Sequence, residues 1–130
     1  MTTFVNLMPH PVRLRSNVAN TTPEPDSTDI VVEPERDNDG KPMPARVSTQ
    51  SGDRIGDVEG VAVFGRTTFG AVEGLPNPMP DTIFLVSALV GGRPEVSGRD
   101  DVFIPGTGPR DGTVRNAEGQ VYAVTRLVQA

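Results

Sequence analysis

Glycine and proline interrupt this 130-residue chain so often that regular helices have little room to form. The chain holds 14 Gly and 13 Pro, and no segment longer than about ten residues carries the 3.6-residue apolar period of an amphipathic helix. Short apolar runs alternate instead with turn-forming residues, a pattern typical of β-strands. We therefore predict a mainly β fold built on an antiparallel sheet, barrel-like or sandwich-like, with at most one short helix.

The strongest strand signal lies at residues 82–86, a β-prone and almost wholly apolar run. We expect this strand to lie centrally in the sheet. The following Ser-Ala-Leu-Val, residues 87–90, either continues the strand or opens the one short helix, near 86–91, before Gly91 and Gly92 end it.

Three hairpins are predicted from turn chemistry. The clearest joins 55–58 to 61–64 across Glu59-Gly60, because a glycine at the end of a two-residue turn accepts a positive φ. A second joins 30–33 to 45–49. The third closes the chain by pairing 113–115 with 121–127 across a turn that ends in Gly119.

The length fits a single domain, residues 1–130. Residues 16–29 are almost wholly polar or proline, and the acidic stretch continues to residue 40, so we expect a mobile acidic loop at 16–40. Seven of the 17 acidic residues lie in this loop. The rest of the chain is therefore close to neutral and presents no broad basic face, so duplex nucleic acid is not an expected partner.

The chain contains no Cys, which excludes a disulfide framework and a Cys-ligated zinc site. The first residues lack the basic and apolar regions of a signal peptide, and no apolar run is long enough to span a bilayer. We expect a cytoplasmic location and no membrane partner.

Catalytic motifs are missing from the sequence. The single His, His10, lies between two prolines, where a structural corner role is the favoured interpretation over catalysis. No His spacing typical of a metal site and no Gly-X-Ser-X-Gly elbow occurs. Asp100 and Asp101 are neighbours whose side chains would face opposite sides of a strand, so a solvated turn with Arg99 as local partner is favoured. We predict no catalytic residue, no metal ligand and no cofactor.

The loop from Gly106 to Gly112 holds ingredients of an anion-binding nest, namely several backbone amides, Thr107 and Arg110. It lacks the Gly-Lys-Ser/Thr ending of a phosphate-binding P-loop, and no clear helix follows it. A mobile loop is therefore the favoured interpretation of this segment, and a ligand contact is the alternative.

The chain contains an Asn-Leu-Met-Pro-His block at 6–10 and a Gly-Ala-Val-Glu-Gly-Leu-Pro-Asn-Pro block within 69–78, together with segments 45–47, 83–90 and 99–105. In their order and spacing, these segments resemble a family of small phage and prophage proteins of unassigned function. The family shows an N-terminal Asn-Leu-X-Pro-His block and a central Gly-X-Val-X-Gly-Leu-Pro-X-Pro block. The resemblance implies a phage setting, with the cytoplasm of a bacterial host or the virion as the location, and it implies little chemistry.

Three functions follow as hypotheses. The first is a non-enzymatic protein that sequesters a phosphate-containing nucleotide used as an immune signal by the host, which makes it an anti-defence candidate. In this hypothesis arginines and loop amides bind phosphates, and an aromatic ring stacks on a base. Its candidate residues are Arg99, Arg110, Phe69, Tyr122 and Thr107. The second hypothesis is a virion structural or assembly protein. The third is a small metal-dependent hydrolase using Asp100, Asp101 or Asp111.

Self-association is also predicted. One Tyr, five Phe and no Trp leave few large side chains to fill a core. The apolar runs at 61–64, 82–90 and 121–128 are more than one thin sheet can hide, so another copy should cover part of this surface. We therefore expect a homo-oligomer, with exposed strand edges near both termini as pairing surfaces.

Overall fold

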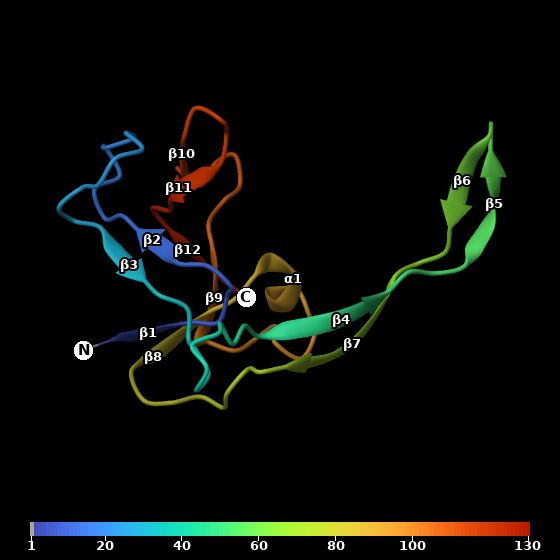
Figure 1. Ribbon diagram of the computed structural model, residues 1–130, viewed down its shortest axis with the longest axis horizontal. Coiled ribbons are helices and arrows are strands. Elements are labelled where there is room, and N and C mark those ends of the chain that lie inside the picture. The colour runs from blue at the N-terminus through green and yellow to red at the C-terminus, as the bar shows by residue number, and fades with distance from the viewer. Residues whose placement is uncertain (1) are drawn as a thin grey trace.

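A small core and one long projecting arm make up the computed structural model, which describes residues 2–130 (Figure 1). The core is built on a four-stranded sheet with the order β1-β8-β9-β12. These strands are β1 (Thr3–Asn6), β8 (Thr82–Leu85), β9 (Val102–Pro105) and β12 (Leu127–Gln129). The mainly β fold is confirmed, with several antiparallel pairs and one short helix, and the strands described do not close into a barrel. Within the largest sheet, however, β8 runs parallel to both β1 and β9.

The central position predicted for residues 82–86 is confirmed. Phe84, Leu85 and Val86 have no exposed surface. Alternate residues of a strand face opposite sides of the sheet, so Phe84 and Val86 pack into one apolar cluster while Leu85 packs into a second. The first cluster contains Leu7, Ala45, Val90, Val96 and Val102, and the second contains Val12, Val32 and Val124. Strand β8 is therefore covered on both faces.

The predicted short helix is α1 (Ala88–Gly91), directly after β8. The Ser87 hydroxyl caps it by accepting a hydrogen bond from the Val90 amide at 3.3 Å. Gly91 lies so close to β9 that an added Cβ would come within 2.5 Å of the Ile104 side chain. Within residues 2–130, no helix has the length and apolar character needed to cross a membrane.

Two small ribbons flank the core. β2 (Val12–Leu14) pairs with β3 (Ile30–Val32), and β10 (Val114–Arg115) pairs with β11 (Val121–Ala123). The second ribbon confirms the predicted closing hairpin over 114–115 and 121–123, but Leu127, which was expected in the same hairpin, begins β12 and pairs with β9. The predicted hairpin between 30–33 and 45–49 is wrong, because residues 16–29 fold back on β2 and bring β3 beside it.

The partner of residues 46–50 lies instead in the arm. β4 (Arg46–Gln50) pairs with β7 (Thr68–Glu73), and beyond them β5 (Arg54–Val58) pairs with β6 (Val61–Phe64). The predicted tight hairpin is confirmed, and Glu59 and Gly60 turn the chain with φ values of 50° and 82°. None of residues 46–73 is buried, and Figure 1 shows the arm leaving the core and bending between its two ribbons.

Two glycines form this bend. Gly52 lies against the backbone of Gly65, so that an added Cβ at Gly52 would come within 2.5 Å of the Gly65 carbonyl carbon. The Gly65 amide donates to the Asp53 carbonyl at 2.8 Å just beyond the crossing. Position 52 therefore requires glycine, whereas a Cβ at Gly65 would come no closer than 3.5 Å to its neighbours. The crossing therefore sets the direction in which the outer ribbon points.

Candidate functional site

The outer ribbon of the arm, residues 53–64, exposes large apolar side chains; we call it the arm tip. Ile55, Val58, Val61 and Phe64 are 71%, 64%, 66% and 58% exposed. Monomeric soluble proteins rarely expose contiguous apolar surface of this kind. An isolated two-stranded ribbon is also only marginally stable in water. Both observations make the arm tip a candidate contact surface.

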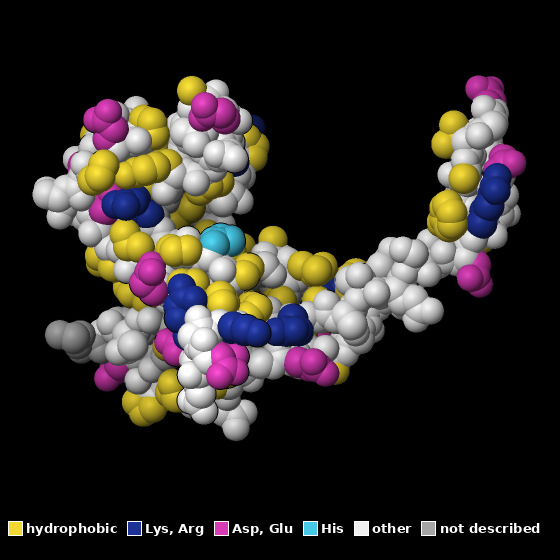
Figure 2. Space-filling view, in the orientation of Figure 1, with side chains coloured by type: hydrophobic (Ala, Val, Ile, Leu, Met, Phe, Trp, Pro, Cys, Tyr) yellow, Lys and Arg dark blue, Asp and Glu magenta, His cyan; other side chains and the backbone are white. Residues whose placement is uncertain are grey.

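The arm tip is amphipathic. Val58 lies opposite Val61 in the pairing, and residues directly opposite one another share a face. The register shift between Arg54 and Gly56 turns Ile55 toward Gly65 on this same face. Figure 2 shows apolar side chains on the side of the tip that turns back toward the core and charged side chains on the outer side.

The opposite face of the arm tip is charged. Phe64 lies opposite Arg54 in the pairing, and Arg54 forms an ion pair with Asp57. The two faces therefore differ in what they can contact, because only the face of Ile55, Val58 and Val61 is wholly apolar.

A cleft of about 690 Å³ lies between β2, β11 and the loop that follows β9; we call it the Tyr122 cleft. Its lining is mostly apolar and includes His10 and Arg13, but no carboxylate. The lining residues are Met8, His10, Pro11, Val12, Arg13, Pro105, Thr107, Gln120, Val121, Tyr122, Ala123 and Val124.

Two arginines shape this cleft. The Arg13 guanidinium carbon lies 4.9 Å from the centre of the Tyr122 ring, within range of a cation–π contact. Arg115 donates hydrogen bonds to the carbonyls of Thr107 and Gly119, each at 2.9 Å. The Arg115 contacts connect the loop after β9 to the closing hairpin, and Arg13 also forms an ion pair with Asp29 at 3.0 Å.

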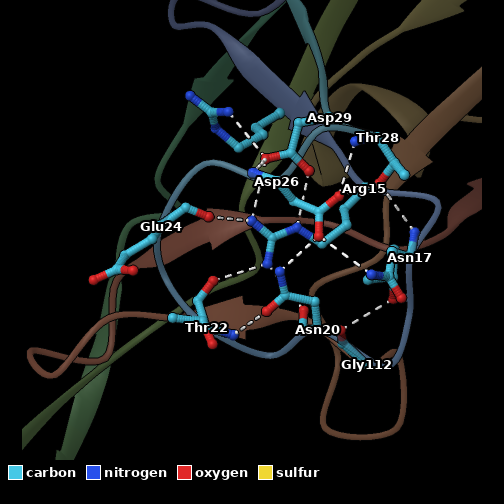
Figure 3. Close-up of polar contacts among 11 residues, drawn as sticks. Arg15, Asn17, Asn20, Thr22, Glu24, Asp26, Thr28, Asp29 and Gly112 are labelled. Carbon is cyan, nitrogen blue, oxygen red and sulfur yellow. Dashed lines mark hydrogen bonds and ion pairs between the residues drawn. The ribbon is translucent and has the colours of Figure 1, made fainter.

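Beside the cleft, the loop 16–29 is organised around one buried arginine (Figure 3). The Arg15 side chain has no exposed surface and Asp29 is 3% exposed. Arg15 donates through Nε and one terminal nitrogen to the two Asp29 oxygens, at 2.9 and 3.1 Å. Its three remaining N–H groups donate to backbone carbonyls at 2.7 to 2.9 Å, namely those of Asn20, Thr22 and Glu24. All five donors of the guanidinium are therefore used.

Two carboxylates of this loop are stabilised in their charged form. Hydrogen bonds from Arg15 lower the pKa of Asp29 to about 2, with smaller contributions from the Asp26 amide and Arg13. Hydrogen bonds from Asn20 and Thr28 hold the pKa of Asp26 well below its usual range. The polar composition of residues 16–29 does not indicate the hydrogen bonds that Arg15, Asp26 and Asp29 make. The mobility expected of residues 16–40 stays a prediction.

A dependence of stability on acid pH follows from Asp29. Its pKa in the folded chain lies near 2 against about 3.9 in an unfolded chain, so the folded state binds the proton less readily. The stability contributed by this group is fully present above about pH 4 and is lost as the pH falls toward about 2. We expect the melting temperature to fall over this range in wild type, and to fall less in Asp29→Asn. Equal slopes in the two proteins would contradict this assignment.

The five residues proposed to bind a nucleotide lie in different parts of the structure. Thr107 and Tyr122 line the same cleft. Arg99 forms a bidentate ion pair with Asp101, with nitrogen–oxygen distances of 3.0 and 2.7 Å, and it donates a third hydrogen bond to the Pro76 carbonyl. Phe69 lies on β7 in the arm, with the Arg93 guanidinium carbon 3.6 Å from its ring centre. Arg110 is exposed in the loop after β9.

The proposed amide nest in this loop already holds an anion from the chain itself. The Gly108 amide donates to the Asp111 carboxylate at 2.8 Å, and Asp111 lies 3.6 Å from Arg126. Arg99 partners Asp101, as expected of a structural turn. Across residues 2–130, no cluster of three or more His, Asp or Glu side chains is arranged to hold a metal ion.

Two buried polar residues were missed in the sequence. One is Arg15; the other is Asn6, which is 1% exposed. The Asn6 amide donates to the carbonyls of His10 and Val32 and its oxygen accepts from the Met8 amide, all at 2.9 Å. Asn6 therefore fixes the corner of the Asn-Leu-Met-Pro-His block. An Asn placed just before a proline corner is the signal that could have identified it.

No protein-family model matches this chain, and no significant match occurs among curated proteins or solved structures.

Proposed function

We propose that this chain is a non-enzymatic assembly protein that joins copies of itself through the arm tip. The observation that carries the proposal is the apolar face formed by Ile55, Val58 and Val61 on a ribbon that contains no buried residue. The phage setting implied by the sequence resemblance agrees with a virion structural or assembly role, and we retain it as part of the proposal.

The free energy gained by burying the apolar face of the arm tip can be compared with the binding free energy that a micromolar complex needs. Burying a Val or Ile side chain that is about two-thirds exposed yields about 1 to 2 kcal/mol, at roughly 25 cal/mol per Å² of apolar surface. Three such side chains on each of two exchanged arms give about 6 to 12 kcal/mol before the costs of association. A micromolar complex needs about 8 kcal/mol. Reciprocal docking of two arms brings the gain closest to this value, and we expect the resulting complex to be weak.

Nucleotide sequestration stays a second candidate, supported by Thr107 and Tyr122 in one cleft. The arginines proposed for the phosphates do not line this cleft, so the geometry supports this candidate less well than assembly. A panel of cyclic nucleotides and ADP-ribose derivatives tests it, because a ligand at a hundred times its dissociation constant adds about 2.7 kcal/mol of stability. A thermal shift with any member would favour sequestration.

Light scattering after size exclusion tests the proposed assembly. Between about 1 and about 100 µM, the range in which a micromolar complex dissociates, we expect a mass that is a multiple of 13.8 kDa at the upper end and falls on dilution. A mass of 13.8 kDa at every concentration would contradict the proposal.

A further inference from the structure

We propose that the arm tip of one copy binds in the Tyr122 cleft of a second copy. The inference rests on the proposed self-assembly and identifies its acceptor surface. The cleft offers apolar side chains to receive the apolar face of the tip, among them Met8, Pro105 and Val121. Val121 is 45% exposed in the single chain, so the cleft has apolar surface left to cover.

Charge distinguishes this cleft from other acceptors. The arm tip carries three carboxylates, Asp53, Asp57 and Glu59, against the single cation Arg54. The lining of the Tyr122 cleft includes no carboxylate, and its one arginine, Arg13, is ion-paired with Asp29. Arg115 donates to the carbonyl of the lining residue Thr107 and forms no ion pair with any residue that the structure describes. An acidic hairpin would therefore meet no like charge in this lining and would lie near the unpaired cation of Arg115, which favours their encounter.

The other large cleft repels the tip. It has a volume of about 560 Å³ and lies at the base of the arm. Three carboxylates, Glu35, Asp37 and Glu73, line it together with one cation, Arg46. An acidic tip would meet like charge there, which is costly at an interface. A third cleft, beside Ile30 and Leu127, has about 330 Å³, less than half the volume of the Tyr122 cleft.

The arm does not fill the cleft of its own core. Figure 2 shows open space between the arm tip and the lobe formed by β2, β3, β10 and β11. The apolar side of the tip faces this space. The tip of a second copy is the occupant that the observations favour, because the complementary charge and apolar surface both belong to this chain.

Engineered cysteines test the contact directly, because the chain has no Cys of its own. A Val61→Cys variant is mixed with a Val121→Cys variant, and a short thiol-specific crosslinker is added. The matched control mixes Val61→Cys with Met79→Cys, because Met79 lines the cleft at the base of the arm. Val121 and Met79 are 45% and 48% exposed, so the two acceptor thiols are equally accessible. Val58→Cys replaces Val61→Cys if light scattering shows that the latter weakens assembly.

We expect the Val61→Cys and Val121→Cys mixture to give at least about tenfold more crosslinked heterodimer than the control mixture, since thiols are joined only at short range. Equal yields, or a product of two Val61→Cys chains as the main species, would overturn the proposed acceptor. If wild type still exceeds 13.8 kDa, such a result leaves self-assembly through the arm standing. A wild-type mass of 13.8 kDa throughout would overturn both.

Discussion

Replacing Val61 with aspartate is expected to convert the assembled protein into monomers of 13.8 kDa with a folded core. Val61 is 66% exposed at the end of the apolar face, so the core does not depend on it. An interface position of this kind contributes about 2 kcal/mol or more, and the buried aspartate adds a desolvation cost. The dissociation constant should therefore rise at least about 30-fold, as measured by light scattering across a dilution series.

Phe64→Asp is the matched control for this variant. Phe64 lies on the same strand, is 58% exposed, and faces Arg54 on the charged side of the tip. The new carboxylate would meet a cation there, so assembly should weaken far less than in Val61→Asp. Equal weakening in the two variants would show that the whole tip, rather than its apolar face, governs association. No weakening in either would remove the tip from the interface.

Replacing Arg15 with alanine is expected to unfold loop 16–29. The change leaves the Asp29 carboxylate, which is 3% exposed, without its main donor, and three backbone carbonyls lose their hydrogen bonds. Removing one partner of a buried ion pair is strongly destabilising, and we expect the melting temperature to fall by roughly 10 °C. Amide exchange within 16–29 should accelerate at least about a hundredfold.

Arg36→Ala is the control for this prediction, because Arg36 makes one exposed hydrogen bond to the Gly40 carbonyl. Its melting temperature should stay close to that of wild type. Arg15→Lys should fall between the two, since lysine has three donors where the guanidinium uses five. Fast exchange of 16–29 already in wild type would contradict the role given to Arg15 and would support the predicted mobility.

Local signals in the sequence predicted the local structure. Glu59-Gly60 identified the arm hairpin because the turn requires positive φ, and the apolar run at 82–86 identified the central strand. The closing hairpin followed from similar turn chemistry. Each of these elements has a signal carried by residues close together in the chain, so it can be predicted without knowledge of the fold.

Contacts between distant segments were not predictable in this way. The parallel pairing of β1 with β8 joins residues almost eighty positions apart, and the apolar period of a strand does not report its direction. The predicted partner of β3 is wrong because Arg15 holds loop 16–29 beside β2 through three backbone carbonyls and Asp29, and no sequence pattern indicates which carbonyls an arginine will contact.

The candidate site was predictable only in part. The apolar run at 61–64 was recognised as an excess that another copy should cover, yet nothing in the sequence shows that it projects on an arm. The ligand residues were chosen by side-chain type, and the fold gives Arg99 and Phe69 partners of their own. Thr107 and Tyr122 meet in one cleft because the loop after β9 lies beside β11.

Hydrogen exchange of the arm at two protein concentrations tests the central claim most directly. Strands β5 and β6 contain no buried residue in the single chain and pair only with each other, so protection that depends on protein concentration would come from a second copy. The account predicts that amides of residues 54–64 are protected at high concentration and lose this protection on dilution, while those of β8 exchange at the same rate throughout. Exchange in 54–64 that is unchanged by dilution would contradict it.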